Sequence, residues 1–78
     1  MGKYYEPTGE ELQRIERDFC YHAPEADQPE RYTSIRNLAR SLAVRIVQSC
    51  PPSRERSLAL TKLEESVMWA NASIARNE

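Results

Sequence analysis

Residues 49–55 read Ser-Cys-Pro-Pro-Ser-Arg-Glu, and they decide the fold because they end one helical pattern and begin another. Pro51 and Pro52 cannot continue the helix that they follow, since proline has no backbone N–H to donate. Ser53 is a good N-cap for a new helix, and Glu55 places negative charge near the positive end of that helix. The stretch therefore predicts a four-residue connection between two helices, which makes them antiparallel neighbours.

On both sides of this turn, apolar residues recur in alternating steps of three and four, the spacing of a helix with one buried stripe. The preceding helix is expected from Pro29 to about Ser49. Its stripe comprises Tyr32, Ile35, Ala39, Leu42 and Ile46, broadened by Leu38, Ala43 and Val47. The following helix is expected from Arg54 to about Arg76. Its stripe comprises Leu60, Leu63, Val67, Ala70 and Ile74, with Leu58, Met68 and Trp69 off the stripe.

A shorter helix is expected near the start of the chain. Thr8 and Glu11 have the spacing of a capping box, and the helix that they begin should run from about Gly9 to Phe19. Its narrow apolar stripe consists of Leu12, Ile15 and Phe19. Residues 21–28 then form a connector, because Pro24 disfavours helix before it and Pro29 suits the first turn of the next helix.

The chain of 78 residues is expected to form a single domain, residues 1–78, of the all-α class. We predict a short N-terminal helix followed by a long antiparallel helical hairpin. A domain of this size buries little apolar surface on its own, and one hairpin buries only one stripe on each helix. Apolar residues outside the stripes need cover from the first helix or another subunit, and we expect a homo-oligomer. These residues are Leu38, Val44, Met68 and Trp69.

The charges are nearly balanced overall but unevenly placed. The net charge is −1, whereas residues 31–56 hold six arginines and one acid. A balanced chain argues against duplex nucleic acid as a partner, which requires a basic surface. The absence of a long apolar run or signal-peptide pattern predicts a soluble, intracellular protein with reduced Cys20 and Cys50 and no membrane partner. The arginine-rich region fits either a solvated helix face with surface ion pairs or a site for a small anion.

Catalysis, metal binding and a cofactor are not expected. The single histidine, His22, lies two residues from Cys20, but nothing specifies the third group and charge-stabilising donors that a thiolate nucleophile needs. Cys20 and His22 alone do not supply four zinc ligands. With only Gly2 and Gly9 in the chain, a glycine-rich phosphate loop is impossible. We therefore predict a protein that is not an enzyme, with no catalytic residues.

The connector offers a different kind of chemistry. Tyr21 and His22 are flat, polar-tipped side chains beside the arginine-rich helix, where Tyr32, Arg36 and Arg40 share one face at spacings of four. An aromatic ring that stacks on a base, next to arginines that pair with phosphate, is suited to a nucleotide-like ligand. The alternative is that the tyrosines are packing residues and His22 is a hydrogen-bonding loop residue.

Several stretches of the chain, taken in order, resemble one phage protein family. In the first half these are residues 19–24 (Phe-Cys-Tyr-His-Ala-Pro), 28–32 (Gln-Pro-Glu-Arg-Tyr), 35–36 and 39–40. In the second half they are residues 50–55, 57–61, 63–65, 67–71 and 74–77. Over residues 19–77 the chain resembles the anti-CBASS cyclic-oligonucleotide sponges, whose hairpin domain is shared with Thoeris anti-defence sponges. Residues 1–18, an N-terminal extension with the short helix, lie outside this resemblance.

The resemblance implies a function and a set of partners. Family members are helical hairpins assembled into oligomers, commonly hexamers, that bind cyclic dinucleotides, and many also bind cyclic trinucleotides at separate pockets. They hold the second messenger without cleaving it, so that host defence effectors are not activated. We therefore expect a phage sponge for ligands such as cyclic GMP-AMP, acting in the cytoplasm of an infected bacterial host.

Carried over residue by residue, the resemblance assigns two sets of ligand-binding side chains. The cyclic dinucleotide set comprises Tyr21 for base stacking, His22 beside it, and Arg36 and Arg40 for the phosphates. A second pocket, for cyclic trinucleotides, would draw on Ser53, Arg54, Asn71 and Arg76. Two other functions stay open: a sponge for cyclic ADP-ribose isomers, and a helical protein-interaction module that binds no small ligand.

Overall fold

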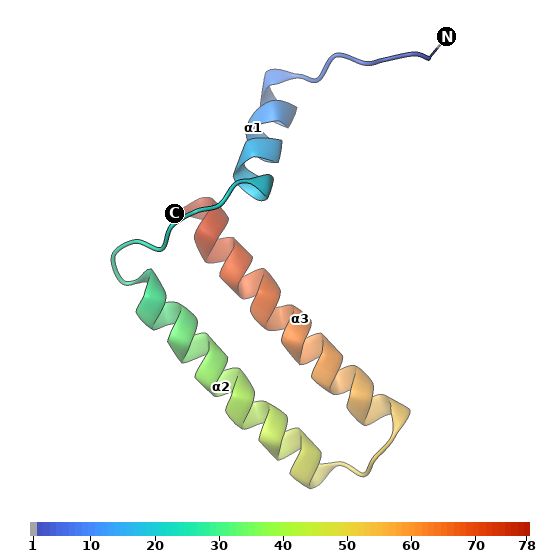
Figure 1. Ribbon diagram of the computed structural model, residues 1–78. Helices are drawn as coiled ribbons and strands as arrows, with labels where there is room; N and C mark the ends of the chain where they lie inside the picture. The colour runs from blue at the N-terminus through green and yellow to red at the C-terminus, as the bar shows by residue number, and fades with distance from the viewer. Residues whose placement is uncertain (1) are drawn as a thin grey trace.

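The computed structural model describes residues 2–78, and in this part of the chain the regular structure is entirely helical (Figure 1). Helix α1 spans Gly9–Phe19, α2 spans Gln28–Ser49 and α3 spans Arg54–Asn77. The all-α class and the three expected helices are confirmed. The only differences are at the ends, where α2 begins one residue earlier and α3 ends one residue later than expected.

Local hydrogen bonds explain where α1 and α3 begin. The Thr8 hydroxyl accepts from the Glu11 backbone N–H at 3.1 Å, and the Glu11 carboxylate accepts from the Thr8 N–H at 2.8 Å. These two bonds form the expected capping box. The Thr8 backbone N–H, and then the Thr8 side chain, lower the pKa of the Glu11 carboxyl by hydrogen bonding. At the turn between α2 and α3, Ser53 accepts from the Arg56 N–H at 3.1 Å as the N-cap of α3.

Arg56 fixes the same turn from its other side. Its guanidinium donates to the carbonyl of Val47 at 3.3 Å and to that of Cys50 at 3.1 Å. The last carbonyls of a helix have no partner within the helix, so Arg56 satisfies groups that the double proline leaves free. The Pro51–Pro52 turn is therefore held by side chains from the start of α3.

Helices α2 and α3 lie side by side along most of their length (Figure 1). All five residues of the expected α3 stripe are half-buried, and Met68 and Trp69 are exposed. On α2, four of the five expected stripe residues are half-buried, but Leu42 is exposed; of the three residues expected to broaden the stripe, Ala43 is half-buried, whereas Leu38 and Val47 are exposed. A straight helix drifts about 20° per heptad from a strict seven-residue repeat, and this drift moves the contact from Leu42 to Ala43.

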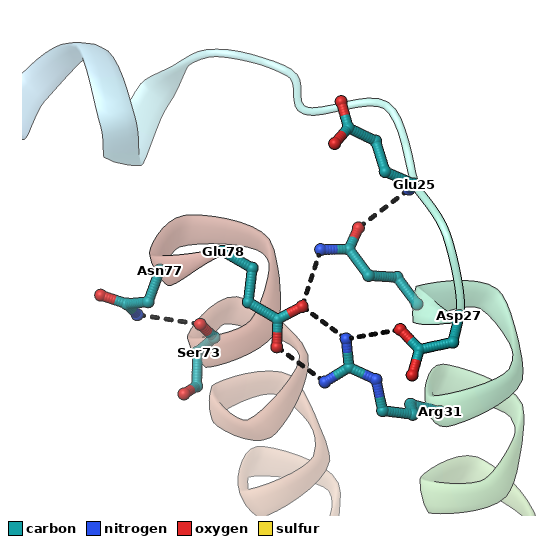
Figure 2. A network of polar contacts seen from close by, with 7 residues as sticks. Glu25, Asp27, Arg31, Ser73, Asn77 and Glu78 are labelled. Atoms are coloured by element: carbon teal, nitrogen blue, oxygen red, sulfur yellow. Dashed lines mark hydrogen bonds and ion pairs between the residues drawn. The ribbon is translucent and has the colours of Figure 1, made fainter.

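A polar network joins the start of α2 to the end of α3, at the end of the helix pair opposite the Pro51–Pro52 turn (Figure 2). Gln28, the one buried residue of the described chain, accepts from the Glu25 backbone N–H at 3.0 Å. Its amide donates to the Glu78 carboxylate at 3.1 Å. Arg31 donates to the same carboxylate and to Asp27, at 2.7 and 3.1 Å respectively. The start of α2 is thus tied to the residue that follows α3.

The single chain has no buried apolar side chain within residues 2–78. Its accessible surface is 6963 Å², whereas a compact monomer of its mass would expose about 4,900 Å². Its radius of gyration is 18.1 Å, against about 11.5 Å for a compact chain of this length. Leu38 and Trp69 are 70% and 63% exposed. The chain alone therefore leaves uncovered the apolar surface that a folded domain normally buries.

Candidate ligand-binding recess

A recess of about 510 Å³ lies where the end of α1, the connector and the adjoining parts of α2 and α3 meet. We call it the end recess. Its aromatic and polar lining includes Tyr21, His22, Tyr32, Arg36, Asn71 and Arg76. Three of the four residues expected to bind a cyclic dinucleotide line it, together with two residues that we expected in a second pocket. Its volume falls within the usual range for small-molecule sites, about 300–1,000 Å³.

Hydrogen bonds from the connector and from α1 shape one wall of the end recess. His22 Nε2 lies 2.7 Å from the carbonyl oxygen of Arg17, and it is the donor because a carbonyl only accepts. This bond turns the connector back onto the last turn of α1. Tyr21 is therefore held next to a fixed imidazole, although its own ring is 86% exposed.

Asp18 joins α1 to α3 across the same wall. Its carboxylate lies 3.1 Å from the Arg17 guanidinium, 3.8 Å from that of Arg14 and 3.6 Å from that of Arg76. It is the only acidic residue in the lining, and three arginines surround it. The end recess therefore keeps an excess of positive charge, which suits an anionic ligand.

Two side chains of the end recess, those of Arg36 and Asn71, have hydrogen-bonding atoms available for a ligand. Arg36 forms no ion pair within residues 2–78, and its only side-chain hydrogen bond is a long one, 3.4 Å, to the Thr33 hydroxyl. The Asn71 side-chain oxygen is buried without a hydrogen-bond partner among residues 2–78. Buried polar atoms are nearly always hydrogen-bonded in native proteins, so Asn71 calls for a partner from outside this chain.

Arg40 lies one helical turn beyond Arg36, outside the end recess. Both arginines line a neighbouring groove of about 410 Å³ between α2 and α3. The groove has an apolar floor in which the small side chains of Ala39 and Ala43 face Leu63 and Val67. Because Arg36 borders both hollows, a ligand with two phosphates could contact Arg36 in the end recess and Arg40 in the groove.

The four residues expected in a second pocket do not meet within one chain. Asn71 and Arg76 line the end recess, whereas Ser53 and Arg54 lie at the turn at the other end of α3 (Figure 1). The 17 helical steps from Arg54 to Asn71 span about 25 Å. A pocket that contains all four side chains would need a second copy of the chain.

Sequence reasoning missed Arg17 and Asp18 as residues of this site, and it placed Tyr32 on the arginine face without counting it in the site. Asp18 belongs to α1, which we expected to lie outside the family-like part. The contact with Arg76 joins residues far apart in the sequence, and no local pattern signals it. Among residues 2–78, no three His, Cys, Asp or Glu side chains are placed to hold a metal ion. In the same part of the chain, no helix is long and apolar enough to cross a membrane.

The fold and the end recess define a small all-helical protein with a basic, aromatic-lined hollow at one end of a helix pair. A family model described as Acb2/Tad1, hairpin domain, matches residues 11–75, and the chain belongs to this family of anti-CBASS and Thoeris sponges. The match includes residues 11–18, which the sequence analysis left outside the resemblance. No curated protein and no solved structure gives a significant match.

Proposed function

We propose that this protein is a phage anti-defence sponge that binds cyclic dinucleotides such as cyclic GMP-AMP and holds them without cleavage. By sequestering the second messenger in the cytoplasm of the infected bacterium, it would keep CBASS effectors inactive. The observation that carries the proposal is the juxtaposition in the end recess of an exposed tyrosine, Tyr21, with Arg36, an arginine that has no ion-pair partner among the described residues 2–78.

The chemistry of the end recess matches that of the ligand. A cyclic dinucleotide has two flat bases and two phosphates. Tyr21 offers a ring face for stacking, and His22 borders it. Arg36 offers a planar fork that donates two hydrogen bonds to one phosphate, and Arg40 is available for the other. Asn71 and Arg76 would add an amide and a further cation from α3.

The assembly that we propose is a homo-oligomer of antiparallel helical hairpins, commonly a hexamer in this family. Support comes from the uncovered apolar surface of the single chain, including Leu38, Met68 and Trp69. At a two-fold axis, each copy offers the same tyrosine and arginine to one half of a roughly two-fold symmetric ligand. The contacts are thereby doubled and arranged before the ligand arrives, which favours tight binding and slow release.

A cyclic trinucleotide would need a different pocket, formed by more than one copy. Ser53 and Arg54 of one chain and Asn71 and Arg76 of another are the candidates. If Asn71 and Arg76 serve the end recess instead, their loss should weaken dinucleotide binding and leave trinucleotide binding unchanged. Parallel titrations of Asn71→Ala with both ligands distinguish these two assignments.

Calorimetry against a panel of cyclic nucleotides, followed by recovery of the ligand, tests the proposed function. We expect cyclic GMP-AMP to bind with a Kd of about a micromolar or tighter, and to be released intact when the protein is heated. Binding of cyclic ADP-ribose isomers alone would instead establish a Thoeris-type sponge. If none of the panel binds, the protein is an interaction module, and recovery of a linear product would make it a nuclease.

A further inference from the structure

The apolar stripe of α1 is not covered by any other part of residues 2–78. Leu12, Ile15 and Phe19 lie on one face of the helix and are all exposed, Phe19 by 83%. Acidic residues border this stripe on both sides, Glu11 on one and Glu16 on the other, at helical positions next to the apolar ones. Glu16 forms no ion pair within residues 2–78.

The side of α2 that faces away from α3 has the complementary pattern. Val44 lies at its centre in a shallow hollow of about 490 Å³, with the uncharged side chains of Asn37, Ser41 and Gln48 around it. Arg40 and Arg45 border the hollow. We call this surface the outer face of α2. No acidic residue occurs between positions 31 and 54, and neither arginine forms an ion pair in the described chain.

We propose that α1 of one copy docks on the outer face of α2 of a second copy. The stripe of α1 would cover Val44, and Glu16 at the edge of the stripe would lie beside Arg45 at the edge of the hollow. The lengths agree, because α1 has 11 residues and the lining of the hollow extends from Asn37 to Gln48. Apolar groups in the centre with opposite charges at the rim are the usual arrangement of a specific interface.

The occupant is a second copy because α1 of the same chain is held elsewhere. The ion pair of Asp18 with Arg76, at 3.6 Å, places the last turn of α1 at the end of α3, and α1 points away from the hairpin (Figure 1). Val44 lies 16 residues beyond Gln28, about 24 Å along α2. The chain also exposes enough surface for such an interface. Its accessible surface exceeds that of a compact monomer of its mass by about 2,000 Å², and a stable interface needs about 800 Å² from each partner.

A charge exchange across the proposed interface tests it in the absence of ligand. Arg45→Glu and Glu16→Arg should each weaken self-association at least about tenfold in sedimentation equilibrium, because each places like charges together at the rim. The double variant, which exchanges the two charges, should recover most of the lost affinity. Lys62→Glu is the matched control, since Lys62 is an exposed cation on α3 and its replacement changes the net charge by the same amount as Arg45→Glu.

The proposal is overturned if Arg45→Glu associates as Lys62→Glu does, or if the double variant associates no better than either single variant. Circular dichroism of each variant at the same concentration checks that the helices are intact. Recovered association in the double variant would also show that neither substitution prevents folding. Calorimetry with cyclic GMP-AMP on the same samples separates the two proposals, because neither Arg45 nor Glu16 lines the end recess. Restored self-association without ligand binding in the double variant would count against the proposed function and not against this interface.

Discussion

Arg31, in the first turn of α2, donates hydrogen bonds to both carboxylate oxygens of Glu78, the residue that follows α3. Arg31 Nη1 lies 2.7 Å from Glu78 Oε2, and Nη2 contacts the other oxygen. The two residues are 47 positions apart, and their contact closes the end of the helix pair opposite the double-proline turn. Glu78 also borders a small cavity with Tyr21 and His22, so this contact helps to shape the surroundings of the proposed ligand site.

This contact makes stability depend on pH in the acidic range. Hydrogen bonds from Arg31, and then from Gln28, lower the pKa of Glu78 to about 2 from an ordinary value of 4.5. The unfolded chain therefore binds this proton more readily, and the contribution is fully present above about pH 4.5 and is lost as the pH falls toward 2. We expect Tm to fall over this window by more in the wild type than in Glu78→Gln.

Thermal unfolding followed by circular dichroism from pH 2 to 6 checks this expectation. Glu65→Gln is the control, because Glu65 is an exposed glutamate of α3 whose one ion pair in the described part of the chain is with Lys62, at 3.4 Å. The control should keep the pH dependence of the wild type. The same pH dependence in Glu78→Gln as in the wild type would contradict the assignment.

Tyr21 should contribute to ligand binding through stacking. Tyr21→Ala is expected to weaken cyclic GMP-AMP binding by about 1–3 kcal/mol, the range for one lost aromatic–base stack. Tyr4→Ala provides the matched control, because Tyr4 is also exposed but does not line the end recess. Calorimetry of both variants checks the prediction, and equal affinities would remove Tyr21 from the site.

Arg36 should act through the shape of its guanidinium as well as its charge. Arg36→Lys keeps the charge but loses the two-pronged geometry, so it should bind more weakly than the wild type and more tightly than Arg36→Gln. The loss in Arg36→Gln should be about 1.5–3 kcal/mol, as for a hydrogen bond to a charged group. Lys62→Gln, a change of the same charge on α3, should have no effect. If Arg36→Lys binds cyclic GMP-AMP as tightly as the wild type, a positive charge at this position is sufficient for binding and the shape of the guanidinium is not needed.

The connector contains one strained residue. Ala26 has φ of 49°, the only positive φ among the described non-glycine residues. This conformation costs an L-residue about 1–2 kcal/mol, and glycine adopts it freely. Ala26→Gly should therefore stabilise the fold by up to about 1 kcal/mol. Ala23→Gly, in the same connector but without positive φ, should be neutral or destabilising; denaturant unfolding of both variants tests the difference.

Trp69 reports on assembly. Its side chain is 63% exposed in the single chain, and it is the only tryptophan. If a second copy covers it, its fluorescence emission should shift to shorter wavelength as the protein concentration is raised. Light scattering on the same samples should give a mass well above 9.0 kDa. A monomeric mass with unchanged emission at micromolar concentration would contradict the proposed oligomer.

The helices could be predicted from the sequence because their signals are local. The Thr8–Glu11 capping box, the double proline and the Ser53 N-cap each act over three or four residues, and each is found in the structure. The stripe of α3 was predicted in full because its steps of three and four keep the same face. On α2, the gradual rotation of a straight helix away from a strict seven-residue repeat turns Leu42 out of the contact, so the prediction for Leu42 is wrong.

The composition of the end recess could be predicted only in part. Tyr21 and His22 are in the connector and Arg36 follows it closely in α2, so their proximity could be predicted from the local sequence. Asn71 and Arg76 join them because α3 returns alongside α2 and because Asp18 binds Arg76 at 3.6 Å. Such contacts depend on helix lengths and on the direction of α1, which no short motif specifies.

Co-crystallisation with cyclic GMP-AMP tests most directly whether the end recess binds a cyclic dinucleotide and leaves it intact. We expect an intact ring in the recess, with a base stacked on Tyr21 and a phosphate at the Arg36 guanidinium. An empty recess at saturating ligand, or a ligand bound elsewhere on the chain, would contradict this expectation.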